Sequence, residues 1–517
     1  MLPSLSSLPL VGAPGRSGAT TPSRDATSDL SDDLLGEIMA YIENGTIGYA
    51  CQVNLRMRAI CSDVALWRAL CVREGYGPPP AGVSWMYHYA RNANPAYARR
   101  VDQDLIDAAS DGDLARMQEL FAAGADVHAQ YDAALRSASI GGHVEVVQML
   151  LAAGADVHAN NDRALWLASE YGRVEVVRLL LAAGADVHTN NEAALQRAAV
   201  EGHAEVVQVL LAAGADVHTN NEAVLRRAVV EGHAEVVRVL LAAGANVHEP
   251  PHDDALRNAS KWGYVEVVKV LFAAGANVHA YDDDALRWAS MEGHVEVVRL
   301  LLAAGADVHA RRGQALLWAS NAGHVEVVKL LLAAGANVHA NNDQALLWAS
   351  MQGHAEVVQV LLAAGADVNT NNEAALREAS MEGHAEVVEV LFLAGANVHA
   401  KNDEALREAS TKGHAEVVEV LLDAGAYVHA RDDEALQTAS EEAHVEVVRL
   451  LLAAGADVHA KNDEALRRAL LHGHLAVVQL LVAGGANALA RHGHLLKLPD
   501  NHPTPLRQQL AAALGYE

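Results

Sequence analysis

Residues 284–310 read DALRWASMEGHVEVVRLLLAAGADVHA, and close copies of this phrase fill most of the chain. Each copy carries a glycine that recurs every 30 residues, with a single 31-residue step where Pro250 and Pro251 stand. A fixed period of this size predicts a solenoid, in which each repeat buries its apolar faces only against its neighbours. The recurring glycines are Gly124, Gly154, Gly184, Gly214, Gly244, Gly275, Gly305, Gly335, Gly365, Gly395, Gly425, Gly455 and Gly485.

Each repeat predicts two short helices. Asp284 suits a helix N-cap, residues 285–292 fit about two helical turns, and Gly293 can end the helix in a left-handed conformation. A second helix is expected from His294 onward, and Gly305 ends it. Its apolar residues cover much of the circumference, so we expect contact with helices on both sides, as stacking requires.

The phrase G-H-x-E-V-V-x-x-L-L-x-x-G-A-D-V-H-A resembles the second half of an ankyrin repeat. The resemblance covers twelve repeats over residues 126–486, and residues 101–125 resemble an N-terminal capping repeat. Here each repeat is three residues shorter than the usual 33 and lacks the T-P-L-H phrase. The shortening falls in the turn before the first helix, where residues such as Asn160 and Asn161 suit a tight turn. The resemblance therefore implies short projecting hairpins, and recognition through the exposed side of the first helix.

Residues 29–76 differ from the repeats. Apolar residues with helical spacing, then helical stretches at 52–60 and 64–73, predict a three-helix module. The stretches Asp33-Leu34-Leu35, Glu37-Ile38-Met39 and Leu66-Trp67-Arg68 resemble the pattern of an F-box. An F-box is a helix-in-groove ligand of the Skp-type adaptor of cullin-RING ubiquitin ligases. The alternative is a small helical cap that shields the first repeat. By position, the resemblance implies that Leu30, Leu34, Leu35 and Ile38 contact the adaptor, with Trp67 packing the module or touching the adaptor.

The sequence thus predicts an all-α protein with an F-box-like module followed by an ankyrin-repeat solenoid. The Pro-, Ser-, Gly- and Thr-rich start has too little apolar surface to offset its ordering entropy, so we expect it to be a disordered tail. The expected parts are the tail 1–28, the module 29–76, a linker and bridging helix 77–100, the capping repeat 101–125, twelve ankyrin repeats 126–486 and a C-terminal cap 487–517.

Tryptophan follows the Leu-x pair in three consecutive repeats only. With Leu286 facing the stack, Trp288 lies about 160° away around the helix and Met291 about 140° away in the other sense, so both point outward. Apolar patches on soluble proteins mark interaction surfaces, and tryptophan is enriched in binding hot spots. Alternatively, each tryptophan lies over the neighbouring helix and tightens the stack. The predicted partner-binding residues are Trp288, Met291, Trp318, Trp348, Met351 and Met381, extended by Trp262 and Tyr171.

Charged residues occupy the tryptophan position in the flanking repeats. Arg197 and Arg227 precede the tryptophans, whereas Glu378 and Glu408 follow them. A partner that crosses the repeats would meet basic, then apolar, then acidic surface.

The composition argues against several classes of function. A formal net charge of −27 repels nucleic acid and anionic membranes, and no apolar stretch is long enough to span a bilayer. The spacing of Cys51, Cys61 and Cys71 indicates neither a disulfide framework nor a zinc site. Of the 27 histidines, 21 fall at two repeat positions, where we expect structural hydrogen bonds rather than metal ligation. No catalytic or nucleotide-binding motif is present, so we expect no enzyme activity, metal or cofactor.

Together these features predict a substrate receptor of a Skp/cullin/F-box ubiquitin ligase, with a Skp-type adaptor and a target protein of unknown identity as partners. The alternative is an ankyrin scaffold or competitive inhibitor without ligase recruitment. The combination resembles proteins that large DNA viruses and intracellular bacteria use to redirect host degradation. We expect a monomer in the cytoplasm, the host cytoplasm if the protein is viral, with the nucleus as a second compartment.

Overall fold

The computed structural model describes residue 40 and residues 60–79, 83–248, 254–486 and 504–514. Every regular element in these ranges is a helix, and the chain divides into two compact units, Met1–Asp216 and Val217–Glu517. The first unit contains α4 (Val64–Arg73), α5 (Trp85–Ala93), α6 (Pro95–Asp111), α7 (Leu114–Ala122), α8 (Ala129–Gly141), α9 (Val144–Ala152), α10 (Ala159–Glu170), α11 (Val174–Ala182), α12 (Thr189–Val200) and α13 (Ala204–Ala212).

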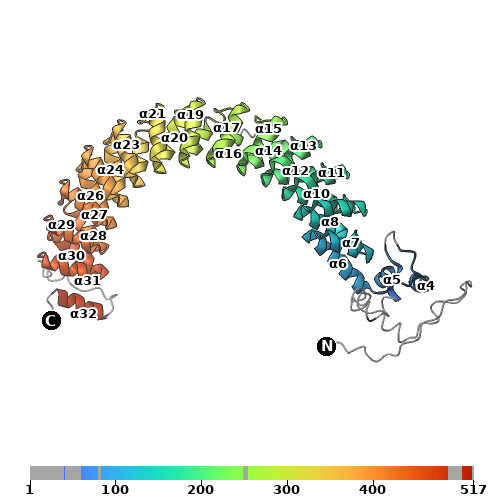
Figure 1. The fold of residues 1–517 in the computed structure, drawn as a ribbon. Coiled ribbons are helices and arrows are strands. Elements are labelled where there is room, and N and C mark those ends of the chain that lie inside the picture. Colours follow the sequence, from blue (N-terminus) through green and yellow to red (C-terminus); the bar gives the residue numbers. More distant parts are fainter. Residues whose placement is uncertain (1–39, 41–59, 80–82, 249–253, 487–503, 515–517) are drawn as a thin grey trace, which may run out of the picture. The chain divides into compact units, whose positions relative to one another are not determined.

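The second unit continues the same alternation of helices (Figure 1). It contains α14 (Thr219–Val230), α15 (Ala234–Ala242), α16 (Asp254–Lys261), α17 (Val265–Ala273), α18 (Asp284–Met291), α19 (Val295–Ala303), α20 (Ala310–Asn321), α21 (Val325–Ala333), α22 (Gln344–Met351), α23 (Ala355–Ala363), α24 (Thr370–Glu382), α25 (Ala385–Leu393), α26 (Ala400–Lys412), α27 (Ala415–Asp423), α28 (Glu434–Glu441), α29 (Val445–Ala453), α30 (Ala460–His472), α31 (Leu475–Ala483) and α32 (Thr504–Ala513).

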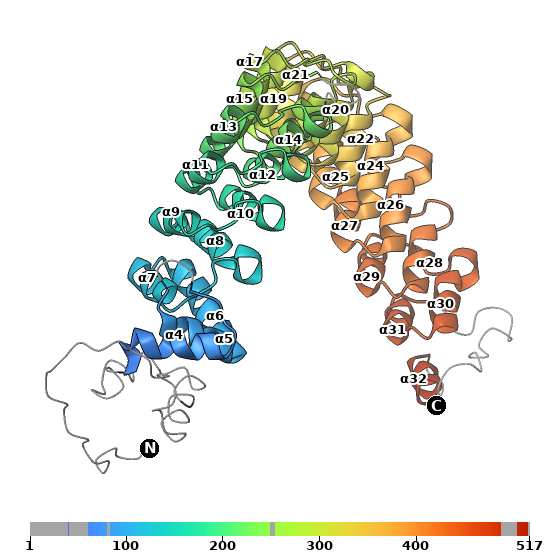
Figure 2. The same cartoon turned by 90° about the vertical axis from the view of Figure 1, so that its right-hand side faces the viewer.

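Within each unit the helices form two layers. The first helix of each repeat packs on the first helices of its neighbours, as α18 packs on α16 and α20, and the second helices do the same. Figure 2 shows this for the second unit, where α22, α24, α26, α28 and α30 form one row and α25, α27, α29 and α31 form the other. Buried leucine and valine side chains fill the space between the layers, among them Leu286, Val298 and Leu301.

The repeat 284–310 shows how the sequence sets the helix boundaries. Gly293 has φ +79° and ends the first helix, and His294 is the N-cap of the second, which confirms both predictions. The predicted N-cap Asp284 was wrong by one residue, because Asp283 takes the cap position and Asp284 is the first helical residue. Asp283 has φ 57°, and its side chain accepts no hydrogen bond from the first turn of the helix, unlike a standard N-cap aspartate.

Where the structure describes it, the turn before the first helix of a repeat is tight and left-handed. In the first unit Asn160, Asn161 and Asp162 have φ values of 57°, 59° and 51°. Asparagine and aspartate tolerate this conformation better than other residues with a Cβ. The prediction that this shortened segment forms a tight Asx turn is therefore confirmed.

A buried carboxylate at the end of this turn joins consecutive repeats. Asp162 is 6% exposed, and its Oδ1 accepts hydrogen bonds from the His158 ring Nδ1 at 3.0 Å and from the Asp186 backbone N–H at 2.9 Å. His158 precedes the carboxylate in sequence, and Asp186 begins the next repeat. The two hydrogen bonds to Asp162 therefore link one repeat to the next. Aspartate or glutamate recurs at this position because its carboxylate supplies the acceptor that the backbone N–H of the next repeat needs. The second histidine position of the repeat thus has the structural role predicted for it.

Gly313 breaks this pattern in the second unit. In the following repeat, Asp343 Oδ1 accepts from the Asp367 N–H at 3.0 Å, whereas Gly313 offers no side chain to the equivalent Asn337 N–H. Among the described residues, no acceptor lies within hydrogen-bond distance of that N–H. Gly313 has φ +76°, and a Cβ built on it would lie 3.4 Å from the Ala340 Cβ, which leaves room for a side chain.

We therefore expect Gly313→Asp to be more stable than Gly313→Ala. Both variants carry the cost of a Cβ at this positive φ, but only the new carboxylate would accept the Asn337 N–H, so their free energies of unfolding should differ by about 1 kcal/mol. Urea unfolding followed by circular dichroism would measure the difference. Gly313→Ala is the matched control, since it adds a Cβ at the same φ without an acceptor and should lower stability. An equal response of the two variants would contradict the bridging role of the carboxylate.

The other recurring histidine bridges the first helices. His324 Nε2 lies 2.9 Å from the Met291 carbonyl oxygen, which is in the preceding repeat, and the same contact recurs along both units. A Cβ built on Gly293 would lie 2.6 Å from the His324 ring, so glycine is needed here for space as well as for its φ. The predicted structural role of this histidine is confirmed. The same bond to a carbonyl oxygen is made by His143, His203, His294, His354, His384, His414, His444 and His474.

The described N-terminal residues pack against the first repeat. Helix α4 spans Val64–Arg73, as predicted, and packs on α5, which packs on α6. The bridging helix predicted from the sequence is interrupted, because Asn94 caps a new helix with Pro95 at its first position. Cys61 is disulfide-bonded, which the spacing argument missed, whereas Cys71 is a buried free thiol whose pKa is raised by burial.

Candidate protein-binding surface

The tryptophan row consists of Trp288, Trp318 and Trp348, one from each of the consecutive first helices α18, α20 and α22. All three side chains are half-buried. This burial fits both roles considered for them, an outward binding surface and packing against the neighbouring repeat. The rings still contribute to the surface, so the row can contact a partner.

Trp318 and Trp348 form a pair. Their ring centroids are 5.5 Å apart with an interplanar angle of 61°, an edge-to-face arrangement across the boundary between two repeats. Among the described residues, neither indole N–H has a hydrogen-bond acceptor. The pair thus combines apolar ring surface with two indole N–H donors.

Trp288 is held differently. Its indole N–H donates to Asp284 Oδ2 at 3.2 Å, and the Arg287 guanidinium lies 4.9 Å from its ring centroid. The Lys261 ammonium, one repeat earlier, lies 4.5 Å from the same centroid and 5.3 Å from that of Trp262. These contacts are cation–π distances. Arg287 is also ion-paired with Asp284, so Lys261 supplies the net positive charge at the Trp288 end of the row.

The remaining predicted partner-binding residues fall into two groups. Met291, Met351 and Met381 are half-buried near the ends of their first helices. Trp262 is 53% exposed and follows α16, in the same compact unit as the row. Tyr171, 47% exposed, follows α10 and belongs to the other unit, so it is described separately from the tryptophan row.

The charged residues that flank the row in sequence also divide between the units. Arg197 lies in the first unit and its guanidinium is 2.7 Å from Glu170, whose hydrogen bond raises the pKa of Arg197. Glu378 and Glu408 lie in the second unit, on α24 and α26, directly after the tryptophan row. Arg227, on α14, also lies in the second unit, so of the two predicted flanks the acidic one shares the unit of the row completely and the basic one only through Arg227.

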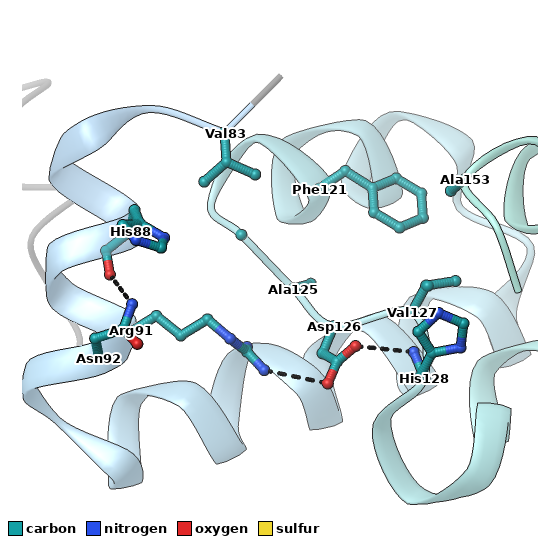
Figure 3. A pocket seen from close by; sticks show the side chains of 11 residues that line it. Val83, His88, Arg91, Asn92, Phe121, Ala125, Asp126, Val127, His128 and Ala153 are labelled. Carbon is teal, nitrogen blue, oxygen red and sulfur yellow. Dashed lines mark hydrogen bonds and ion pairs between the residues drawn. The ribbon is translucent and has the colours of Figure 1, made fainter. Parts of the chain in front are cut away.

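Two features of the first unit were not predicted from the sequence. Trp166 follows Leu165 directly and so escapes the Leu-x-Trp pattern, yet it is half-buried on α10 with the Arg163 guanidinium 3.6 Å from its ring centroid. An open cavity of about 660 Å³ lies between α5 and the segment after α7 (Figure 3). Arg91 crosses it to Asp126 at 3.6 Å and also pairs with Asp102, so this charge is already neutralised.

The predicted adaptor-binding residues are described only in part. Leu30, Leu34, Leu35 and Ile38 lie outside the described residues. Trp67 is 1% exposed, its indole N–H donates to the Ile60 carbonyl at 2.9 Å, and its ring lies 5.7 Å from that of Tyr89. Of the two roles considered for Trp67, this geometry favours packing over contact with an adaptor.

The described ranges contain neither a candidate membrane span nor a candidate metal site. No helix there is long and apolar enough to cross a membrane, and no group of three or more His, Cys, Asp or Glu side chains is arranged to hold a metal ion. The histidines that repeat most often are engaged with backbone carbonyls or carboxylates. Of the C-terminal histidines, His472 is described and its ring stacks on that of His474.

Comparison with known proteins agrees with this architecture. The family model "Ankyrin repeats (3 copies)" matches residues 105–191, 184–250, 225–312, 286–372, 316–402 and 406–492, and the chain belongs to this family. Among solved structures 285 chains match, including the crystal structure of the human ASB11 ankyrin repeat domain. That match has 27% sequence identity and a TM-score of 0.36, and covers 39% of this chain and 98% of that one. No curated protein sequence matches.

Proposed function

We propose that the protein binds a target protein through the tryptophan row. The observation that carries this proposal is the Trp318–Trp348 pair, which presents half-buried aromatic surface and two indole N–H groups with no acceptor in the part of the chain that the structure describes. Ankyrin repeats indicate a role in protein–protein interaction, and aromatic anchors with partly desolvated rings are typical of binding hot spots.

The finer proposal is that the protein is the substrate receptor of a Skp/cullin/F-box ubiquitin ligase. It rests on the F-box-like sequence of residues 29–76. In this role the chain makes and breaks no bond itself. It raises the effective concentration of the target near the ubiquitin-charged enzyme. The resemblance to viral and bacterial receptors suggests a host protein as the target.

A second candidate is an ankyrin scaffold or competitive inhibitor without ligase recruitment. One observation favours it: α4 packs on α5 and α5 on α6, with Trp67 buried against Tyr89, as expected of a helical cap on the first repeat. A solenoid needs such a cap to cover its terminal apolar face. The two candidates share the target-binding surface and differ only at the N-terminal module.

Binding to purified Skp-type adaptor separates these candidates. The full chain should bind the adaptor, and Leu34→Asp/Leu35→Asp/Ile38→Asp should weaken binding by at least about 100-fold, because carboxylates would replace apolar anchors in a groove. Leu8→Asp/Leu10→Asp, which places charges in the N-terminal tail, is the control and should bind as the wild type does. If the wild-type chain fails to bind in a calorimetric titration, the ligase proposal is lost while target binding is untouched.

A further inference from the structure

We propose that the surface from Lys261 to Glu408 binds a protein segment whose apolar side chains cover the Trp318–Trp348 pair and whose lysine or arginine side chains face Glu378 and Glu408. This inference rests on the proposed target binding and names the chemistry of the partner. It concerns the second compact unit alone.

The apolar part of the site is defined by the ring pair. Trp318 and Trp348 touch edge to face, so a partner side chain would lie against both rings instead of inserting between them. Their free indole N–H groups can donate to backbone carbonyls of the segment, which suits an extended chain whose carbonyls are not used in a helix. Met351 adjoins the pair on α22 and supplies adaptable apolar surface.

The charges on either side of the pair are opposite. On the upstream side, Lys261 lies over the rings of Trp262 and Trp288. On the downstream side, Glu408 has no cation within 4.0 Å among the described residues, whereas Glu378 is ion-paired with Arg377 at 3.6 Å, so Glu408 supplies most of the uncompensated negative charge. The partner's cations are therefore attracted to one end of the site and repelled from the other, which fixes its direction.

Neighbouring carboxylates do not compete for the same cations. Glu404 lies 2.8 Å from Arg377 and Glu434 lies 2.9 Å from Arg407, so these side chains are paired within the array. The net charge of −27 also favours a cationic partner, since it steers positive segments toward the surface at long range. Charge complementarity thus selects a cationic protein segment over an acidic one.

Peptide selection tests this proposal without a known target. A random peptide library would be selected on the full-length protein and depleted on its Trp318→Ser/Trp348→Ser variant, and the enriched peptides titrated calorimetrically. We expect peptides that join apolar residues to lysine or arginine. Glu378→Lys/Glu408→Lys should weaken their binding by about 10- to 100-fold, because the reversed charges repel the peptide.

The matched control is Glu386→Lys/Glu416→Lys, which reverses two exposed carboxylates on the second helices of the same repeats and should change affinity by less than about 2-fold. Tryptophan-dependent peptides that are acidic or neutral, or that ignore the Glu378/Glu408 reversal, would overturn this inference and leave target binding intact. If no enriched peptide depends on the tryptophans, both the inference and the proposed binding surface fail.

Discussion

Replacing Trp288, Trp318 and Trp348 together by serine should weaken target binding by at least about 100-fold, since tryptophan hot spots contribute about 2 kcal/mol or more each when truncated. The largest share should come from Trp318 and Trp348, whose indole N–H groups have no acceptor among the described residues. Calorimetric titration with a selected peptide measures the loss, and circular dichroism establishes that the variant is helical.

The same variant should also be less stable than the wild type. The Trp318–Trp348 contact crosses a repeat boundary, and such aromatic pairs contribute about 0.5–1.5 kcal/mol beyond their area burial. Trp166→Ser is the matched control, because Trp166 is another half-buried tryptophan on a first helix but lies outside the row. It should leave binding unchanged. Complete unfolding of the triple variant would instead favour the view that the row only tightens the stack.

Gly293→Ala should lower stability more than replacement of Gly305, the other positive-φ glycine of the repeat. The φ of +79° at Gly293 costs about 1–2 kcal/mol for a residue with a Cβ. The new Cβ would lie 2.6 Å from the His324 ring, and overpacking of this kind costs about 1–3 kcal/mol more. We therefore expect a total decrease of about 3 kcal/mol in the free energy of unfolding, measured by urea denaturation.

Gly305→Ala is the control for this prediction. Gly305 has φ +92°, but no heavy atom lies within 4 Å of a Cβ built there, so this variant carries the backbone strain without the clash. The difference between the two losses in free energy of unfolding gives the cost of the steric clash with the His324 ring. Equal losses would show that the histidine contact contributes nothing to the need for glycine.

The repeat itself was predictable because its boundaries depend on local chemistry. Gly293 must adopt a left-handed conformation, and a pair such as Asn160-Asn161 suits a left-handed turn, so both can be recognised without knowledge of the neighbouring repeats. The N-cap was placed one residue late because Asp283 and Asp284 are both aspartates. The sequence pattern does not show which of them takes the left-handed φ.

The candidate site was less predictable because it depends on contacts between repeats. The angular position of Trp318 on its own helix indicates an outward direction, but Trp348 from the next repeat covers part of its ring. Tyr171 was grouped with the tryptophan row because it is aromatic, but it belongs to the other compact unit, which the sequence does not show. Trp166 does not fit the Leu-x-Trp pattern, because it follows its leucine directly. Arg163, three residues earlier on the same helix, is the sequence signal that could have indicated a cation–π contact there.

Oxidative labelling of the tryptophans, read by mass spectrometry, tests the central claim most directly. In the free protein, Trp318 and Trp348 should be oxidised more than buried Trp67 and less than Trp262, which are 1% and 53% exposed. A selected peptide should protect Trp318 and Trp348 and leave Trp166 unchanged. If the pair is as unreactive as Trp67 in the free protein, or reacts equally with and without the peptide, the tryptophan row is not the binding surface.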